Sequence, residues 1–277
     1  QLNGKKLSYN NYNDIFSALL ISKSLPKNIG TVIVKHANPC GISINKSDLK
    51  SYKLALACDP ISAFGGIVSC NFKIKKKLAY ELKKIFLEVV VCNGIENSAL
   101  KILKSKKNLR IIDASNLNNY NLNNIHSLFG TFLLQTPDIF SFSKSNFKVV
   151  SKKKPSFQTL KNLIFTFNIC KYIKSNAIVI TNKGSTIGIG SGQTSRVDSC
   201  EIAIKKMNKF YKEKYDDELI AASDAFFPFV DGFEKLVQAG ISAVIQPSGS
   251  IKDKEIIKFA NQAGIILVFS KTRHFRH

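Results

Sequence analysis

Apolar and polar positions along this chain follow two periods, which together predict helices and strands in regular alternation. Apolar residues recur every three or four positions over 14–23 and 48–58, which indicates a helix in each segment. Short, mostly apolar runs at 31–35 and 67–70 indicate buried strands. This alternation is typical of an α/β fold.

The alternation continues to the end of the chain. A lysine-rich amphipathic helix is expected over 73–86, followed by short strands at 88–91 and 109–113. In the second half, strands are expected at 177–181, 185–190, 242–246 and 265–269, and helices over 156–174, 198–210, 231–239 and 252–263. No internal sequence repeat is clear enough to prove a duplication.

Two polar segments interrupt this pattern near the middle of the chain. Residues 114–125 are rich in asparagine, and residues 143–156 are again polar, with "SKKKPS" just ahead of the next predicted helix. We therefore predict a division near residue 150, into subdomains 1–150 and 151–277.

The composition is that of a globular protein. Of 277 residues 44% are hydrophobic, which is enough to bury a substantial core. The start, "QLNGKKLSYNNYND", has no apolar signal-peptide region, and no run of about 18 apolar residues follows, so we expect a cytoplasmic protein without a membrane span. The six cysteines form no C-x-x-C pair and lie in apolar segments, which predicts small buried side chains and neither disulfides nor a zinc site.

The formal charge of +22 raises the alternative of a basic nucleic-acid-binding module. The basic residues do not cluster, however: four of the 41 are arginines and the rest are lysines, spread along the whole chain. Since lysine fills most basic positions, we expect each remaining arginine to be present because its planar guanidinium group can bind a phosphate or carboxylate through two hydrogen bonds. Three of the four, Arg196, Arg273 and Arg276, lie in the motifs described next.

The segment "TVIVKHANPCGISI" places Lys35 and His36 at the end of a predicted strand. We expect 38–41, "NPCG", to form a rigid turn that holds these side chains at a strand terminus, where open α/β sheets commonly bind ligands. The histidine is suited to act as a general base and the lysine to stabilise negative charge. A histidine that only hydrogen-bonds the turn is an equally good interpretation. A zinc deaminase is a further alternative, although its H-x-E and P-C-x-x-C motifs are incomplete here.

Three segments of the second half are candidates for ligand binding. The glycine-rich "GIGSGQTSR" at 188–196 lies between a predicted strand and helix and can present backbone N–H groups to an anion, or form a plain tight turn. "ASDAFFPFVDG" at 222–232 combines Asp224 and Asp231 with phenylalanines, which suits a planar heterocycle or simply a packed core. In "QPSGSIKDKE", Ser250 is predicted to be the N-cap of a helix, with N–H groups that could face a ligand.

These motifs together identify a family resemblance. "VKHANPCG", "DPISAFGG", "KSNAIVI", "IGIGSGQTSRVDS", "SDAFFPFVDG", "QPSGSIKD" and the terminal "RHFRH" resemble, in order and spacing, the AICAR transformylase domain of the bifunctional AICAR transformylase/IMP cyclohydrolase family. The resemblance covers essentially the whole chain. It implies two tandem cytidine-deaminase-like α/β/α subdomains without the deaminase zinc site, and a homodimer whose active site lies between subunits.

The resemblance also implies a reaction and its residues. The family transfers a formyl group from 10-formyltetrahydrofolate to the 5-amino group of AICAR, with no catalytic metal. His36 matches the proton acceptor, Lys35 the residue that stabilises the tetrahedral oxyanion, and Asn176 an asparagine that orients the reacting groups. By the same resemblance AICAR contacts His36, Gly65, Glu88, Asn176, Phe226 and Arg273, and the folate contacts Arg196, Val197, Asp231, Ser250 and Ile251.

Three departures from the family pattern are visible. Glu88 stands where some relatives have aspartate, and its contact with AICAR is therefore less defined. The sequence starts after the family's Arg-Tyr-Gly segment, which helps to bind the AICAR phosphate and ribose, and it lacks the N-terminal cyclohydrolase domain. We expect either a fragment of a longer protein or an incomplete active site, and assign no ring closure to IMP to these residues. A degraded, non-catalytic remnant is a further alternative.

Overall fold

The computed structural model describes residues 1–117, 123–143, 146–212 and 218–277. The helices in these residues are α1 (Tyr9–Ser24), α2 (Asp48–Cys58), α3 (Lys76–Lys84), α4 (Asn97–Lys104), α5 (Phe157–Cys170), α6 (Arg196–Phe210), α7 (Val230–Gln238) and α8 (Asp253–Gln262). The strands are β1 (Gly30–Lys35), β2 (Asn38–Ile44), β3 (Ile67–Cys70), β4 (Val89–Cys92), β5 (Arg110–Asp113), β6 (Asn124–Leu128), β7 (Thr131–Gln135), β8 (Phe147–Val149), β9 (Ile178–Asn182), β10 (Ser185–Gly190), β11 (Ile220–Ser223), β12 (Ala243–Pro247) and β13 (Ile266–Ser270).

The same order of elements occurs twice along the chain. Each half has a helix, an antiparallel hairpin, a second helix, and then three parallel strands with helices between them: α1 to β5 in the first half and α5 to β13 in the second. All these strands join one eleven-stranded sheet in the order β5-β4-β3-β1-β2-β10-β9-β11-β12-β13-β8. The two hairpins meet at its centre, where Ser43 on β2 pairs with Ser185 on β10. The topology therefore shows a repeated order of elements, although the sequence shows no clear repeat.

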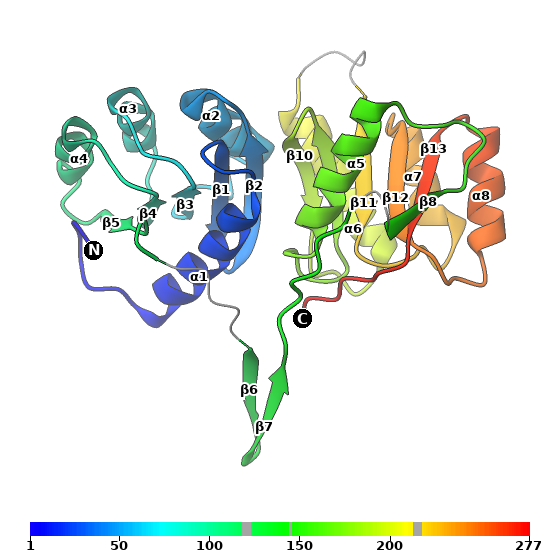
Figure 1. Cartoon of the computed structure of the whole chain (residues 1–277), viewed down its shortest axis with the longest axis horizontal. Coiled ribbons are helices and arrows are strands. Elements are labelled where there is room, and N and C mark those ends of the chain that lie inside the picture. Colours follow the sequence, from blue (N-terminus) through cyan, green and yellow to red (C-terminus); the bar gives the residue numbers. More distant parts are fainter. Residues whose placement is uncertain (118–122, 144–145, 213–217) are drawn as a thin grey trace.

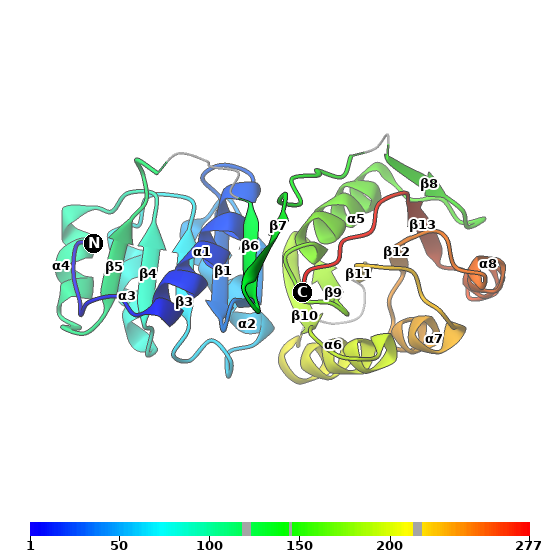
Figure 2. The same cartoon turned by 90° about the horizontal axis from the view of Figure 1, so that it is seen from below.

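Helices cover both faces of this sheet, which gives an α/β protein (Figures 1 and 2). Helices α1 and α5 share one face, and their buried residues, such as Ile21 and Phe167, belong to a single apolar cluster that extends across both halves. The opposite face has two separate clusters, one under α2, α3 and α4 and one under α6, α7 and α8. The predicted division near residue 150 stays a prediction.

The segment 38–41 is not the turn that the sequence predicts. It forms the first part of β2, which pairs antiparallel with β1, and the turn itself consists of His36 and Ala37. Pro39 is tolerated in this strand because the register shifts between Ile33 and Val34, at a bulge where a missing N–H donor costs little. Gly41 is required by packing: a Cβ atom there would lie 1.9 Å from the carbonyl oxygen of Ala55 on α2.

Other boundaries also differ from the prediction. Helix α3 is shorter than 73–86 because Ile74 is buried in a bridge to Ile95 before the helix begins at Lys76. The predicted N-cap at Ser250 is wrong: Lys252 precedes α8, and the Ser250 hydroxyl accepts a hydrogen bond from the Lys252 N–H within the preceding turn. Strands β6, β7 and β8 fall in or beside the polar segments and are not predicted. Part of segment 114–125 lies outside the described residues.

The six cysteines are confirmed as buried, and all are free. Burial raises the pKa of the Cys58 thiol to about 12, which is the behaviour of a small core side chain. Among the described residues, no helix is long and apolar enough to cross a membrane.

Candidate active site

The predicted site residues lie at one edge of the central sheet. Strands β10, β11, β12 and β13 run in one direction, so the residues that follow them meet at the edge where β1 ends and where β3, β4 and β9 begin. The residues brought to this edge are Lys35, His36, Gly65, Glu88, Asn176, Arg196, Val197, Phe226, Asp231, Ser250, Ile251 and Arg273. The sequence motifs thus converge because the two halves are antiparallel to each other.

The turn between β1 and β2 presents His36 at this edge. His36 and Ala37 have φ values of +54° and +58°, so both adopt the left-handed conformation that a two-residue hairpin turn requires. Neither residue is a glycine or asparagine, and such a conformation costs roughly 1 kcal/mol for each. The turn is held by Asp14 on α1, whose carboxylate accepts hydrogen bonds from His36 N–H at 3.1 Å and Ala37 N–H at 2.7 Å. The His36 residue is exposed.

Lys35 is held from a different segment. Its Nζ donates a hydrogen bond of 2.8 Å to the carbonyl oxygen of Phe64, in the loop that connects α2 to β3. Gly65 follows with φ +73°, and its N–H donates to the Phe86 carbonyl oxygen at 2.9 Å. A Cβ atom at Gly65 would lie 3.9 Å from Lys35 Nζ, so the glycine and the lysine predicted for the site are neighbours.

Glu88 lies at the start of β4, beside this loop. Its Oε2 accepts hydrogen bonds from Asn11 Nδ2 at 3.0 Å and from Arg110 Nη1 at 3.2 Å, and its side chain is 40% exposed. Glu88 N–H also donates to the Gly66 carbonyl oxygen at 3.0 Å. The partly exposed carboxylate is thus fixed in place by a helix and a strand, and can still accept a hydrogen bond from a ligand.

A second network occupies the same edge in the other half of the sheet. Arg196, the first residue of α6, is buried and donates from Nη2 to Asn176 Oδ1 at 2.7 Å and from Nη1 to Ser223 Oγ at 2.8 Å. Arg196 Nη1 also pairs with the fully buried carboxylate of Asp224. Ser175 Oγ donates to the other oxygen of that carboxylate at 2.5 Å. The arginine fork therefore binds a carboxylate inside the protein.

Asn176 shapes the glycine-rich segment. Its Nδ2 donates to the carbonyl oxygens of Gln193 at 2.9 Å and Thr194 at 3.1 Å, so both ends of the amide have partners within the protein. Gly188 and Gly190 of the same motif belong to β10 and are explained by packing, since a Cβ atom at Gly190 would lie 1.9 Å from the Ser199 carbonyl oxygen on α6. For these two glycines the structural explanation therefore holds: they lie in a strand and allow helix α6 to pack closely against it.

The two networks are connected directly. Ser191 Oγ, just after β10, donates to Asn38 Oδ1 at 3.2 Å, and Asn38 Nδ2 donates to the His36 carbonyl oxygen at 3.1 Å. An ion pair also joins the two halves: Lys206 on α6 lies 2.9 Å from the buried carboxylate of Asp59. Asp59 begins the loop whose Phe64 carbonyl oxygen accepts the hydrogen bond from Lys35. The motif of the first half and the glycine-rich segment of the second are thus joined in one hydrogen-bonded cluster.

The remaining predicted residues border this site. The Arg273 guanidinium lies 5.9 Å from the centre of the Phe226 ring, a cation–π contact that brings two predicted AICAR contacts together. His274 N–H donates to the Asp224 carbonyl oxygen at 2.9 Å, which ties the C-terminal segment to the Arg196 network. Val197 and Asp231 lie in the first turns of α6 and α7, and Ser250 and Ile251 in the turn before α8, with Asp231 and Ile251 exposed.

Comparisons with known proteins decide the family. A family model described as AICARFT/IMPCHase bienzyme matches residues 1–206. The chain belongs to this family. The bifunctional purine biosynthesis protein PurH of Leptospira biflexa is 43% identical over 277 residues, and proteins of the same name from Rhodospirillum rubrum and Oceanobacillus iheyensis are 43% and 41% identical. Each match covers 100% of this chain and 53 or 54% of the relative, so the chain spans about half the length of the curated relatives it matches.

Membership of the AICARFT/IMPCHase family confirms the resemblance, and the structure adds residues that sequence patterns miss. Asp14 and Lys206 lie outside every quoted motif, and Asn38 and Asp59 lie inside two of them without an assigned role, yet all four contact or support the motif residues. A hydrogen bond across distant segments has no signature in a single sequence. The same applies to Asn11, whose contact with Glu88 joins residues 77 positions apart.

The zinc-deaminase alternative gains no support from the described residues. Within them, no group of three or more histidine, cysteine, aspartate or glutamate side chains is placed to hold a metal ion. Cys40, next to the proposed base, is buried in β2, and burial, with a further contribution from Asp59, raises the pKa of its thiol to about 12. A thiol with that pKa is poorly suited to be a metal ligand or a nucleophile at neutral pH.

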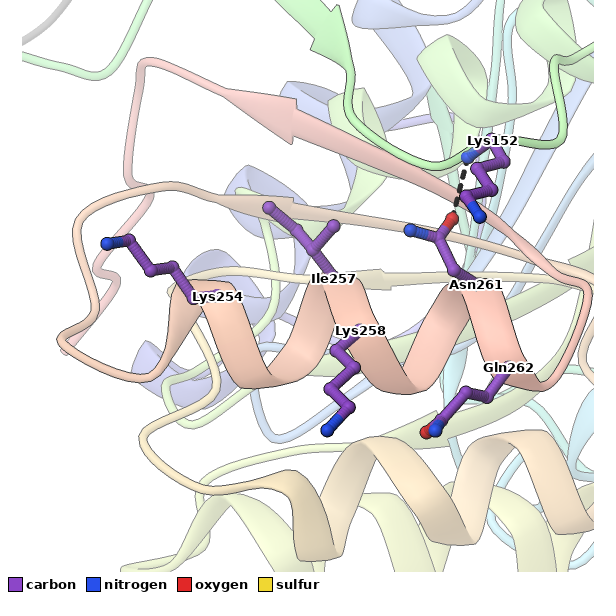
Figure 3. A pocket seen from close by; sticks show the side chains of 6 residues that line it. All are labelled: Lys152, Lys254, Ile257, Lys258, Asn261 and Gln262. Carbon is purple, nitrogen blue, oxygen red and sulfur yellow. Dashed lines mark hydrogen bonds between the residues drawn. The ribbon is translucent and has the colours of Figure 1, made fainter.

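The structure also has a surface hollow of about 390 Å³ along helix α8, formed by residues other than the predicted site residues. It is lined by Lys152 and by five residues of α8, and its wall includes a hydrogen bond of 2.7 Å from Lys152 N–H to Asn261 Oδ1 (Figure 3). The hollow contains none of the predicted site residues, and its basic groups are exposed surface lysines. The candidate site is therefore defined by the hydrogen-bonded edge of the sheet and not by the hollow.

Proposed function

We propose that this chain is the formyl-transfer part of an AICARFT/IMPCHase bienzyme. It would transfer the formyl group of 10-formyltetrahydrofolate to the 5-amino group of AICAR in purine biosynthesis, in the cytoplasm. The observation that supports this most directly is the Asn38–Ser191 hydrogen bond, which joins the Lys35–His36 turn to the Asn176–Arg196 network. Ring closure to IMP belongs to the family's other domain and is not part of the proposal.

The geometry suits the chemistry of acyl transfer. The 5-amino group of AICAR attacks the formyl carbon, and His36 accepts the proton that this nitrogen loses. Lys35 stabilises the negative charge on the formyl oxygen of the tetrahedral intermediate. The bond between the formyl carbon and N10 of the folate then breaks, N10 takes up a proton, and formyl-AICAR and tetrahydrofolate are released. Asn176 would act mainly through the loop that it orders.

The binding roles follow from placement. Partly exposed Glu88 and the cation–π pair of Phe226 and Arg273 offer a carboxylate, a flat apolar face and a cation for the AICAR ring and phosphate. For the folate we propose Val197, Asp231, Ser250 and Ile251, where Ile251 is 98% exposed and ready to cover an apolar ring. Arg196 is buried, and we therefore propose that it supports the folate site through its contacts with Asp224 and Asn176.

We further propose two tandem cytidine-deaminase-like units, divided near residue 150, and a homodimer with the site between subunits. The repeated order of elements supports the tandem arrangement. The β6–β7 hairpin, which projects from the body of the molecule (Figure 1), supports the dimer. Phe132, Leu133 and Leu134 alternate between its two faces, and all three are more than half exposed. A two-stranded ribbon is marginally stable alone, so a partner surface is needed on both faces.

His36→Ala tests the proposed base. We expect formyl transfer to fall by roughly 10²- to 10⁴-fold while the protein stays folded and keeps its mass in solution. Tyr80→Ala, at an exposed aromatic ring on α3 that lies outside both the predicted site and the hairpin, is the control and is expected to keep the wild-type rate. A His36→Ala variant with near-normal turnover would refute the role of His36.

A further inference from the structure

Helix α1 reaches the β1–β2 turn through one carboxylate. Asp14 Oδ2 accepts a hydrogen bond from His36 N–H and Asp14 Oδ1 accepts one from Ala37 N–H, at 3.1 Å and 2.7 Å. The two donors are the two central residues of the turn, so one side chain binds the entire turn backbone. Asp14 lies in α1 and belongs to none of the ligand-binding motifs of the sequence, and nothing in its immediate neighbours, "NDIFS", marks it as special.

These two bonds fall where the turn most needs them. Two-residue hairpin turns of this kind normally contain Asn-Gly, because both central residues require positive φ. Here the residues are His36 and Ala37, with φ values of +54° and +58°, and neither has the conformational freedom of glycine. A carboxylate that accepts from both N–H groups favours this backbone geometry over the alternatives, since charge-assisted bonds are stronger than neutral ones.

The position of the His36 side chain depends on this backbone. The residue is exposed, so little packing restricts its ring, and the direction of its Cα–Cβ bond is set by the turn. The turn is also held by Asn38, whose Nδ2 donates to the His36 carbonyl oxygen and whose Oδ1 accepts a hydrogen bond from Ser191 of the second half. Asp14 and Asn38 thus fix the N–H and the C=O of the same residue.

We propose that Asp14 is a positioning residue for formyl transfer: it holds the β1–β2 turn in the left-handed geometry that directs His36 at the substrate amine. This inference rests on the proposed function of His36 and deepens it. It explains why a strained turn of histidine and alanine persists at this place, since the residue needed at the first position is the base itself and the strain is offset by a contact from α1.

Three variants test the proposal. Asp14→Asn keeps one acceptor oxygen and loses the charge, so the turn should loosen. Ala37→Gly supplies a residue that adopts positive φ freely and should restore the turn when it is combined with Asp14→Asn. Asp48→Asn is the matched control: Asp48 also accepts a hydrogen bond of 2.7 Å from a backbone N–H, that of Leu49 on α2, but touches no site residue in the described contacts.

The measurements are kcat and KM for AICAR, and hydrogen exchange at the His36 and Ala37 amides. For Asp14→Asn we expect kcat to fall about 10- to 100-fold with KM changed less than about threefold, because a misdirected base affects the chemical step. Exchange at the two turn amides should accelerate at least about tenfold, while the amides of 32–34 in β1 remain protected. In the double variant, about half of the loss in kcat or more should be recovered, and Asp48→Asn should match wild type.

Each outcome has a defined meaning. Unchanged kcat in Asp14→Asn, or a loss that Ala37→Gly does not reverse, overturns the proposal. Unchanged exchange at the two amides overturns it as well, even where activity falls. If Asp14→Asn fails to fold, the double variant is measured in its place, and wild-type-like exchange and kcat there support the proposal. Absence of formyl transfer in wild type would instead refute the proposed function, and amide exchange would still show whether Asp14 holds the turn.

Discussion

The Ser191 hydroxyl donates a hydrogen bond of 3.2 Å to the side-chain oxygen of Asn38, and this contact joins two segments 153 residues apart. It occurs because β2 and β10 are antiparallel neighbours, so the start of one lies beside the end of the other. Through Asn38 the contact extends to the His36 carbonyl oxygen. The proposed base and the loop ordered by Asn176 are thereby parts of one hydrogen-bonded unit.

A double-mutant cycle of Asn38→Ala and Ser191→Ala tests this unit. Each single change should lower kcat by several-fold. The double variant should raise the activation free energy by less than the sum of the two single effects, with a coupling energy of about 1 kcal/mol. Steady-state kinetics on the wild type and the three variants measures the coupling. Strictly additive effects would show that the contact does not connect the two networks.

The Asp59–Lys206 pair predicts a pH dependence of stability. Burial acts to raise the pKa of Asp59, but the hydrogen bonds from Ser62 and the contact with Lys206 outweigh it and lower the pKa below its ordinary value. The carboxylate therefore stabilises the fold above about pH 4, and this stabilisation is lost as the pH falls through the lowered folded-state pKa.

We expect Asp59→Asn to lower the free energy of unfolding at pH 7 by about 1–3 kcal/mol, and to lose less stability than wild type between pH 6 and pH 3. Denaturant unfolding across that range gives both quantities. Glu255→Gln, in an exposed pair with Lys252, is the control and should change stability by less than about 0.5 kcal/mol. Parallel pH profiles for wild type and Asp59→Asn would contradict the assignment.

Cys40 should be chemically inert in the folded protein, although it lies next to the proposed site. Burial raises the pKa of its thiol to about 12, so only about one thiol in 10⁴ or fewer is ionised at pH 8. Alkylation by iodoacetamide should be at least about 100-fold slower than in the denatured chain, as followed by mass spectrometry. Fast modification of Cys40 with loss of activity would instead indicate a reactive, accessible thiol.

The apolar hairpin predicts a specific effect on assembly. Phe132→Asp places a charge on a side chain that is 72% exposed in the single chain. If the hairpin is buried by a second copy, the variant should dissociate to a monomer, with the loss of formyl transfer that a shared site requires. Lys148→Asp, which places the same charge on an exposed position of β8, is the control and should leave the mass in solution unchanged. A Phe132→Asp variant with the same mass as wild type would exclude the hairpin from the interface.

Much of this fold could be predicted from the pattern of apolar residues. The strands at 67–70 and 185–190 and the helix at 48–58 have the predicted bounds, because a buried strand or an amphipathic helix determines its own periodicity. The turn at 38–41 could not be predicted correctly. Proline and glycine normally indicate turns, and here Pro39 lies at a bulge while Gly41 and Gly190 are required by helices that cross the strand.

The candidate site shows the same contrast. The motifs locate Lys35, His36 and Asn176, whose placement at one edge follows from the sheet. The residues that hold them, Asp14 and Asn38, act through hydrogen bonds between distant segments, and their amino acid types are common in any helix or turn. Arg196 was expected to use its fork on a ligand, and the structure places that fork on Asp224 inside the protein.

The most direct test of the account is formation of formyl-AICAR from AICAR and 10-formyltetrahydrofolate. The chain should be assayed alone and with the family's upstream segment attached, each with and without a metal chelator. We predict product that depends on the folate donor, is indifferent to the chelator, and disappears in His36→Ala. Absence of product from both forms, with the protein folded and dimeric, would contradict the central claim.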